Sequence, residues 1–295
     1  MHIVNLLLPD FLLIALGAIL LRITNWGPAF WTGAEKLIYY VLFPALLFYS
    51  TARAPIDFAA AGQVLQIAIL SCVAGIVLGW LGKPLFAAGP MVFESGVQTA
   101  FRFNSYIALA IAGRLGAEAS SLMGVIIGFV VPLCNLGAVH ALVKDKRGLP
   151  LELVKNPLLM ATLSGILFNL LGWKLPELAG AFLSRLGNAS LALGLIMVGA
   201  GLRLAGLHAA KGLAAWFLGV KLFAMPAIAW GLGTWMGLSP AHLQLVVLFA
   251  ALPTASSCYV LAVRMGGNGA FVAFLISIGT LISMATLPLW LALLH

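Results

Sequence analysis

Leu252-Pro-Thr-Ala-Ser-Ser-Cys258 breaks one of the most apolar stretches of this chain, and Phe101-Arg-Phe-Asn-Ser-Tyr106 breaks another. Both breaks lie within runs long enough to cross a bilayer, since about 20 helical residues span about 30 Å of hydrocarbon. A backbone in hydrocarbon finds no water, so irregular backbone survives there only where protein or a wet cavity surrounds it. Paired breaks in two halves of a chain are typical of secondary transporters.

The composition around the breaks is that of an integral membrane protein. Hydrophobic residues make up 63% of the 295, charged residues make up 8%, and the mean hydropathy is +1.11. No segment has the composition of a soluble domain. We therefore predict an all-α integral membrane protein with ten transmembrane helices. The predicted spans are 5–22, 34–52, 64–86, 91–113, 119–143, 157–173, 186–204, 212–237, 240–263 and 269–293.

The net charge of +8 does not indicate a nucleic-acid partner. The sixteen basic residues are scattered and form no patch with interleaved aromatic residues. They follow the positive-inside rule instead, because the odd-numbered loops hold ten of them and the even-numbered loops hold four. The odd loops are therefore predicted to be cytoplasmic, with both termini on the outer face.

Ten spans divide at the basic loop into two halves of five, and an odd number per half gives the halves opposite orientations. A shift of 150 residues places Pro90 on Pro240 and Arg114 on Arg264, which is weak support for an inverted repeat. We predict a single membrane domain made of a first five-helix repeat (1–143), a cytoplasmic linker loop (144–156) and a second five-helix repeat (157–295).

Each break carries groups suited to binding an anion. A proline such as Pro253 removes a backbone donor and frees carbonyls before it, and the half-helix that follows presents its N-terminal amides to an anion. Counted from Pro90, Asn104 lies roughly 20 Å into the bilayer. The alternative is a structural kink stabilised by neighbouring hydroxyls. The candidate substrate-binding residues at the two breaks are Asn104, Ser105, Tyr106, Pro253, Thr254, Ser256 and Ser257.

Three further polar residues lie deep in predicted spans, where ionisable groups are costly and functional by default. Arg102 is a candidate for bidentate contact with a substrate carboxylate, or else it snorkels to the surface or pairs with Glu94. Lys221 is a candidate for substrate contact, or else it donates to carbonyls freed at a helix end. Asn135 either bridges helices or faces the cavity.

No Asp or Glu falls at mid-depth in a predicted span, which disfavours a proton carrier built on a buried carboxylate pair. A coupled sodium ion would need carbonyl, Asn, Ser and Thr oxygens. The three cysteines have neither metal-site nor disulfide spacing, and no hydrolase, zinc or phosphate-loop motif is present. We therefore predict no catalytic residue, no metal ligand and no cofactor.

Fragments along the whole chain resemble the auxin efflux carrier family in its bacterial branch. The most specific are Phe101-Arg-Phe-Asn-Ser-Tyr-Ile107, Val131-Pro-Leu-Cys-Asn-Leu-Gly137 and Leu252-Pro-Thr-Ala-Ser-Ser257. The resemblance implies two inverted five-helix repeats, similar to those of bile-acid symporters and sodium/proton antiporters. It further implies that broken helices 4 and 9 cross at the substrate site, that a mobile bundle moves like an elevator, and that dimers form.

The resemblance also implies roles by position. Asn104 matches the crossover asparagine, Pro253 matches the crossover proline, and Asn135 matches a polar position common in the bacterial branch. The chain departs from the pattern at Phe103 and Ile111, which stand where other members have proline. How sharply the fourth helix unwinds is therefore left open.

The sequence thus predicts a secondary active transporter of a small organic anion, a mono- or dicarboxylate that is auxin- or malonate-like. The expected setting is a homodimer in a bacterial inner membrane, with a sodium or proton coupling ion left open. One alternative is a sodium-coupled importer of bulkier amphipathic anions resembling bile-acid symporters, and a channel also stays open. A membrane-embedded enzyme is disfavoured, because Ser256 and Ser257 have no His or Asp at plausible depth.

Overall fold

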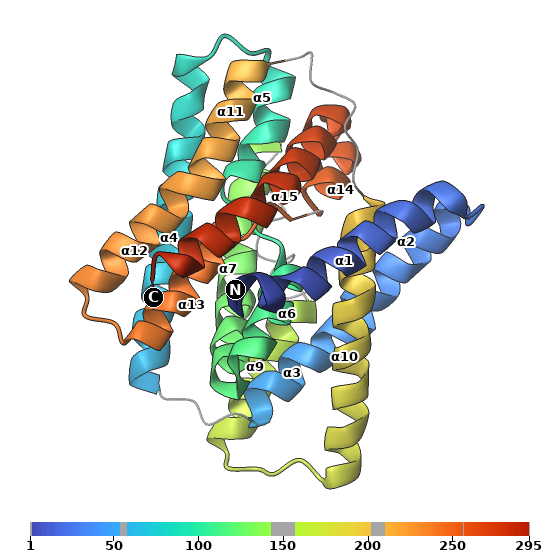
Figure 1. Cartoon of the computed structure of the whole chain (residues 1–295), viewed down its shortest axis with the longest axis vertical. Coiled ribbons are helices and arrows are strands. Elements are labelled where there is room, and N and C mark those ends of the chain that lie inside the picture. Colours follow the sequence, from blue (N-terminus) through green and yellow to red (C-terminus); the bar gives the residue numbers. More distant parts are fainter. Residues whose placement is uncertain (1, 54–57, 143–156, 202–209, 256, 295) are drawn as a thin grey trace. The chain divides into compact units, whose positions relative to one another are not determined.

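The computed structural model describes residues 2–53, 58–142, 157–201, 210–255 and 257–294, and every regular element in these ranges is a helix (Figure 1). In chain order they are α1 (His2–Ile23), α2 (Pro28–Leu37), the π-helical turn η1 (Ile38–Leu42), α3 (Phe43–Arg53), α4 (Phe58–Leu85), α5 (Pro90–Gly96), the 3-10 turn η2 (Val97–Ala100), α6 (Ser105–Leu115), α7 (Ala117–Leu142), α9 (Pro157–Leu170), α10 (Glu177–Ala200), α11 (Lys211–Gly219), the π-helical turn η3 (Val220–Ala224), α12 (Met225–Trp235), α13 (Pro240–Ala251), α14 (Ser257–Arg264) and α15 (Gly269–Ala292).

Within the described part of the chain, five helices are long and apolar enough to cross a membrane, and two shorter apolar helices accompany them. The prediction of an all-α membrane protein is confirmed, whereas the number of ten spans stays a prediction. The predicted linker loop 144–156 lies outside the described residues. The five long helices are Ala61–Leu85, Ala117–Leu142, Glu177–Ala200, Lys211–Trp235 and Gly269–Ala292, and the shorter two are Leu12–Ile23 and Pro240–Ala251.

The outer surface carries many large apolar side chains. Leu178 is 84% exposed, Trp235 is 83% exposed and Ile23 is 71% exposed. Soluble monomers rarely expose large contiguous apolar patches, whereas lipid is a suitable neighbour for such a surface. Polar side chains are instead found inside, and their arrangement defines the candidate site described below.

The chain forms two compact units, and each draws on both halves of the sequence. Unit 1 comprises Met1–Gly62, Tyr106–Pro132 and Gly148–Ala200, and unit 2 comprises Gln63–Ser105, Leu133–Arg147 and Gly201–His295. The boundary within α7 falls between Pro132 and Leu133. These units differ from the predicted repeats, because a compact unit follows spatial contact and a repeat follows sequence. The repeat boundaries stay a prediction.

Unit 1 is held together by close helix packing. Helix α1 packs against α10, and α3 packs against α9 and α10. A Cβ atom at Gly199 would meet the carbonyl oxygen of Ile14, and one at Gly17 would meet the α10 backbone, so these two helices approach at small residues. Asn169 Nδ2 donates to Thr51 O at 3.0 Å and joins α9 to α3.

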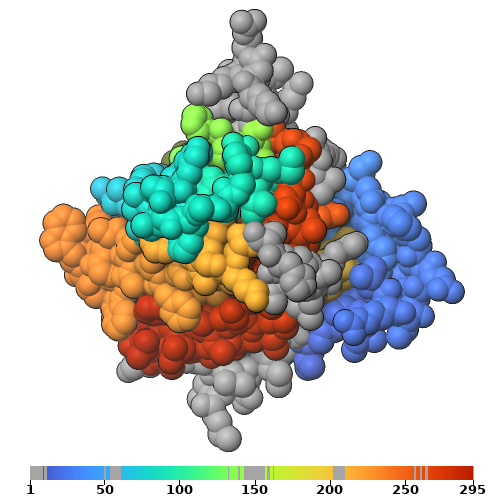
Figure 2. Space-filling view, turned by 90° about the horizontal axis from the view of Figure 1, so that it is seen from above, coloured from blue at the N-terminus to red at the C-terminus, as the bar shows by residue number. Residues whose placement is uncertain are grey.

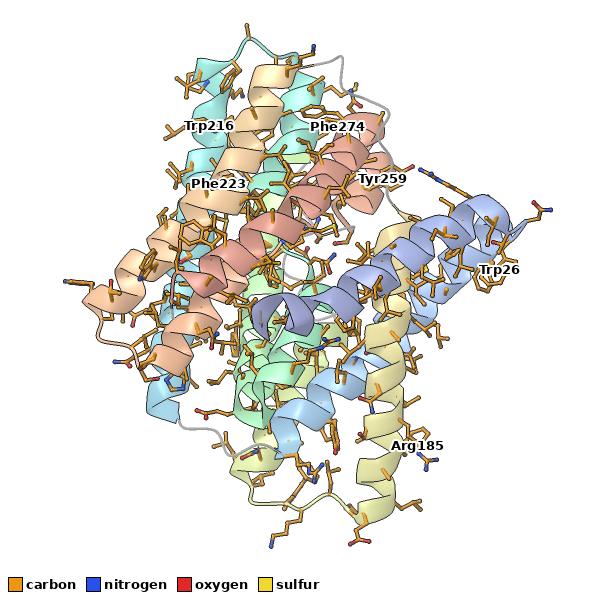
Figure 3. The ribbon with its side chains drawn as sticks, viewed as in Figure 1. Trp26, Arg185, Trp216, Phe223, Tyr259 and Phe274 are labelled. Atoms are coloured by element: carbon orange, nitrogen blue, oxygen red, sulfur yellow. The ribbon has the colours of Figure 1, made fainter. Side chains whose placement is uncertain are left out.

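Unit 2 is built from most of α4, from α5 and η2, from the end of α7 and from the described helices after residue 210. Helix α12 packs against α13, and both α13 and α14 pack against α15. Figure 2 shows α15 running along α11 and α12 on one face, and Figure 3 labels Trp216 on α11 and Phe274 on α15. Trp216 Nε1 donates to Leu78 O at 2.9 Å, which joins α11 to α4.

Candidate functional site

The first break interrupts the polypeptide between α5 and α6. Helix α5 tightens into η2, residues 101–104 are not helical, and α6 begins at Ser105. The break is buried, since Phe101 is 0% exposed and Asn104 is 1% exposed. The Arg102 N–H donates back to Gln98 O at 3.0 Å. The helix unwinds here without a proline, and Phe103 lies inside the break.

The second break separates α13 from α14. Helix α13 ends at Ala251, and Leu252 adopts an extended backbone with ψ of 142° before Pro253. Regular structure resumes at Ser257, the first residue of α14. Proline supplies no N–H and disfavours helical geometry in the residue before it, which explains why the helix stops at this point. The candidate residue Ser256 lies outside the described residues.

The two breaks lie against each other within unit 2. The Asn104 N–H donates to Pro253 O at 2.8 Å. In the other direction, Thr254 Oγ1 donates to Thr99 O at 2.8 Å. Asn104 and Thr254 are both almost fully buried, so water does not compete for these bonds. We refer to residues 99–104 and 250–254 together as the crossing.

Arg102 joins the crossing to two further helices. Its Nη1 donates to Gln98 Oε1 at 2.8 Å, and its Nη2 donates to Asn135 Oδ1 at 3.0 Å and to Ser257 Oγ at 2.9 Å. The side chain is 7% exposed. All three acceptors are neutral, and Glu94 is not among the partners of Arg102 in the described residues. Asn135 bridges helices, which was one of its two expected roles.

Gln98 and Thr99 are polar residues of the site that the sequence reasoning missed. Gln98 is fully buried; its Nε2 donates to Cys258 O at 3.2 Å and to Ser95 O at 3.1 Å, while its Oε1 accepts from Arg102. The spacing of Gln98 and Arg102 could have revealed this contact, because residues four positions apart lie on the same face of a helix.

Lys221 lies in the π-helical turn η3 and is 1% exposed. Its Nζ donates to Ala250 O at 2.9 Å and lies 3.7 Å from Met225 Sδ. Ala250 belongs to the last turn of α13, so Lys221 bonds a carbonyl at a helix end. This arrangement corresponds to the second of the two roles expected for this residue.

One candidate lies outside unit 2. Tyr106 belongs to unit 1, where its ring stacks on Phe43 with centroids 4.3 Å apart. The free thiols of Cys72 and Cys134 share a hydrogen bond, with their Sγ atoms 3.4 Å apart. In the described ranges, no group of three His, Cys, Asp or Glu residues is placed to hold a metal ion. The described candidates in unit 2 are Arg102, Asn104, Ser105, Asn135, Lys221, Pro253, Thr254 and Ser257.

Unit 2 also carries most of the positive charge. It contains nine of the sixteen basic residues but two of the eight acidic residues, Glu94 and Asp145. Unit 1 is close to neutral by the same count, with seven basic and six acidic residues. The two buried cations of unit 2, Arg102 and Lys221, bond neutral atoms among the described residues.

Apolar spanning helices, an apolar exterior and helices broken at buried polar residues define a multi-pass membrane protein of the transporter class. A family model described as membrane transport protein, the family of the auxin efflux carriers, matches residues 139–291, slightly more than half of the chain. The chain belongs to this family, which confirms the predicted resemblance. It is 26% identical over 290 residues to an uncharacterized transporter of Methanothermobacter thermautotrophicus, with 94% of each chain covered.

Proposed function

We propose that this protein is a secondary active transporter of a small organic anion, a mono- or dicarboxylate, which binds at the crossing in unit 2. The observation that carries the proposal is Arg102, a buried guanidinium whose bonded acceptors are all neutral. A buried charge without a counter-charge is costly, and an arriving carboxylate removes that cost while it gains charge-assisted hydrogen bonds. The cation excess of unit 2 also favours an anionic cargo.

The neighbouring groups support the same chemistry. Ser257 is an exposed residue whose Oγ accepts from Arg102. It is also the first residue of α14, whose N-terminal amides favour an anion. Arg102 would offset the charge of the substrate, while Ser257 and Asn135 would orient its carboxylate. The Asn104 side chain would help to position the substrate, while the Asn104 N–H and the Thr254 hydroxyl would hold the two breaks together. The role of Tyr106 stays a prediction.

For the architecture, we propose ten transmembrane helices in two inverted five-helix repeats, with broken helices 4 and 9 crossing at the site. Supporting observations are the helix breaks at residues 101–104 and after Ala251 and the bonds between them. An elevator mechanism is supported by the location of these bonds, since all of them lie within unit 2 and can move as one body. A homodimer in a bacterial inner membrane, with both termini outside, completes the proposal.

The substrate class is tested by thermal stabilisation of the purified protein with mono- and dicarboxylates, because a ligand that binds only the folded state raises the Tm. At 100 times its Kd, the correct anion stabilises by about 2.7 kcal/mol. A charge pair at 4 Å contributes about 4 kcal/mol at an effective dielectric constant of about 20, so Arg102→Gln is expected to weaken binding by roughly 100- to 1,000-fold.

Arg185→Gln is the matched control, since Arg185 lies on α10 in unit 1 with its side chain exposed (Figure 3). This variant should bind the anion as the wild type does. Asn104→Ala should abolish uptake into proteoliposomes without loss of folded protein. Unchanged binding by Arg102→Gln, or no stabilisation by any carboxylate, would contradict the proposal.

A further inference from the structure

Helix breaks inside a membrane protein free carbonyl groups at the C-terminal end of each half-helix, and ion-coupled carriers use such carbonyls to hold sodium. At the crossing, three backbone carbonyls already accept hydrogen bonds from other groups of the protein. One belongs to η2, one to the end of α13 and one to the second break. Thr99 O accepts from the Thr254 hydroxyl at 2.8 Å, Pro253 O accepts from the Asn104 N–H at 2.8 Å, and Ala250 O accepts from the Lys221 ammonium at 2.9 Å.

The position of Lys221 follows from the sequence around η3. Pro226 has no N–H to donate to Leu222 O, and the indole of Trp290 donates to that carbonyl at 2.9 Å instead. The turn that results directs Lys221 into unit 2, whereas Phe223 is 49% exposed on the outside (Figure 3). A π-helical turn of this kind is frequent at functional sites.

The charge of Lys221 matches the end of the helix that it contacts. A helix C-terminus carries about half a negative charge, and a nearby cation offsets it. The contacts of Nζ are the Ala250 carbonyl and the Met225 sulfur, so the ammonium has no acidic partner among the described residues. A buried ammonium in such surroundings is costly and indicates a function.

We infer that Lys221 is a built-in cation that offsets the C-terminal end of α13, where an ion-coupled carrier would bind sodium. Lys221 is therefore a positioning residue that acts through α13. The crossing needs no bound sodium, and the carrier is not the sodium-coupled importer considered as an alternative. The consequence for transport rests on the proposed function, whereas the consequence for ion binding does not.

The first test measures the Tm of the purified wild-type protein in sodium chloride and in choline chloride at equal ionic strength, without any substrate. We expect the two values to agree, because the carbonyl that sodium would use already has its donor. A rise of about 2 °C or more in sodium would overturn the inference, since it would report a bound sodium ion. This measurement requires no variant and no knowledge of the cargo.

The second test compares Lys221→Ala with Lys221→Met in the same two salts. Alanine leaves the place beside Ala250 O open to a small cation, so the Tm of this variant should rise in sodium relative to choline. Methionine fills the place with a neutral chain of similar length, so its Tm should be low in both salts. A Tm of Lys221→Met close to that of the wild type, with no response of Lys221→Ala to sodium, would show that lysine only fills space there and would overturn the inference.

The third test is uptake of a radiolabelled carboxylate into proteoliposomes with sodium or choline on both sides. The wild type should transport at the same rate in both, and Lys221→Met should lose uptake in both. Sodium-dependent uptake by the wild type would refute the inference but leave the anion transporter intact. If no carboxylate is transported, the proposed function fails, and the two Tm tests still decide the role of Lys221.

Discussion

Replacing Thr254 by valine tests whether the two breaks stabilise each other. The Thr254 hydroxyl donates to Thr99 O at 2.8 Å across 155 positions of sequence, and Thr254 is 1% exposed. Valine has nearly the same shape but no donor, so the variant removes one bond and leaves a buried carbonyl without that partner. Water cannot take the place of the hydroxyl at a site this well buried.

The magnitude follows from the cost of an unsatisfied buried acceptor, about 1–3 kcal/mol. In a protein of this size 1 kcal/mol corresponds to about 2–4 °C, so the Tm should fall by about 2–12 °C. Thr254→Ser keeps the donor and loses one methyl group, which costs about 0.8 kcal/mol and predicts a smaller fall.

The assay is the thermal unfolding of each purified variant, followed by tryptophan fluorescence in detergent. Thr234→Val is the matched control, because the exposed Thr234 hydroxyl bonds carbonyls of its own helix, and this change should stay within about 0.5 kcal/mol. If Thr254→Val unfolds at the temperature of the control, the bond between the breaks contributes nothing and the reasoning fails.

Three further predictions concern other contacts. Gly199→Ala should lower the Tm strongly, because the new Cβ would meet the Ile14 carbonyl. The control Gly33→Ala has open space around the new Cβ and should be neutral or stabilising. Equal unfolding temperatures of the two variants would contradict the close approach of α1 and α10. A membrane-permeant oxidant should join Cys72 and Cys134, whose sulfurs lie 3.4 Å apart, and peptide mass spectrometry should find that link but none to Cys258. Trp216→Phe should destabilise by about 0.5–1.5 kcal/mol in thermal unfolding, since it removes the indole bond to Leu78 O, while Trp235→Phe on the exposed surface should not.

The helix breaks were visible in the sequence because proline and polar residues inside an apolar run leave a clear mark. The start of α10 was harder to predict: the span was expected to begin at residue 186, and the helix begins at Glu177. Hydropathy finds the most apolar part of a helix, whereas this helix also includes a first segment that carries Glu177, Ser184 and Arg185. An acidic residue in the first turn favours the earlier start.

The candidate site was predicted in part. Arg102, Asn135 and Ser257 were each named from their depth or position, but the bonds that join them span 33 and 155 positions and depend on helix packing. Gln98 was missed because its place on the helix face of Arg102, four positions away, was not considered. The division into two units could not be predicted either, since hydropathy locates helices and does not say which of them pack together.

The two buried cations of unit 2 have an electrical consequence under the proposed function. Moving one elementary charge through a membrane potential of 100 mV involves about 2.3 kcal/mol. A bound dicarboxylate would balance Arg102 and Lys221, and the loaded site would cross the field with no net charge. The empty site would still carry the charges of Arg102 and Lys221 when it returns across the membrane. The membrane potential would therefore act on this return step, which carries no substrate, and would set the turnover rate through it.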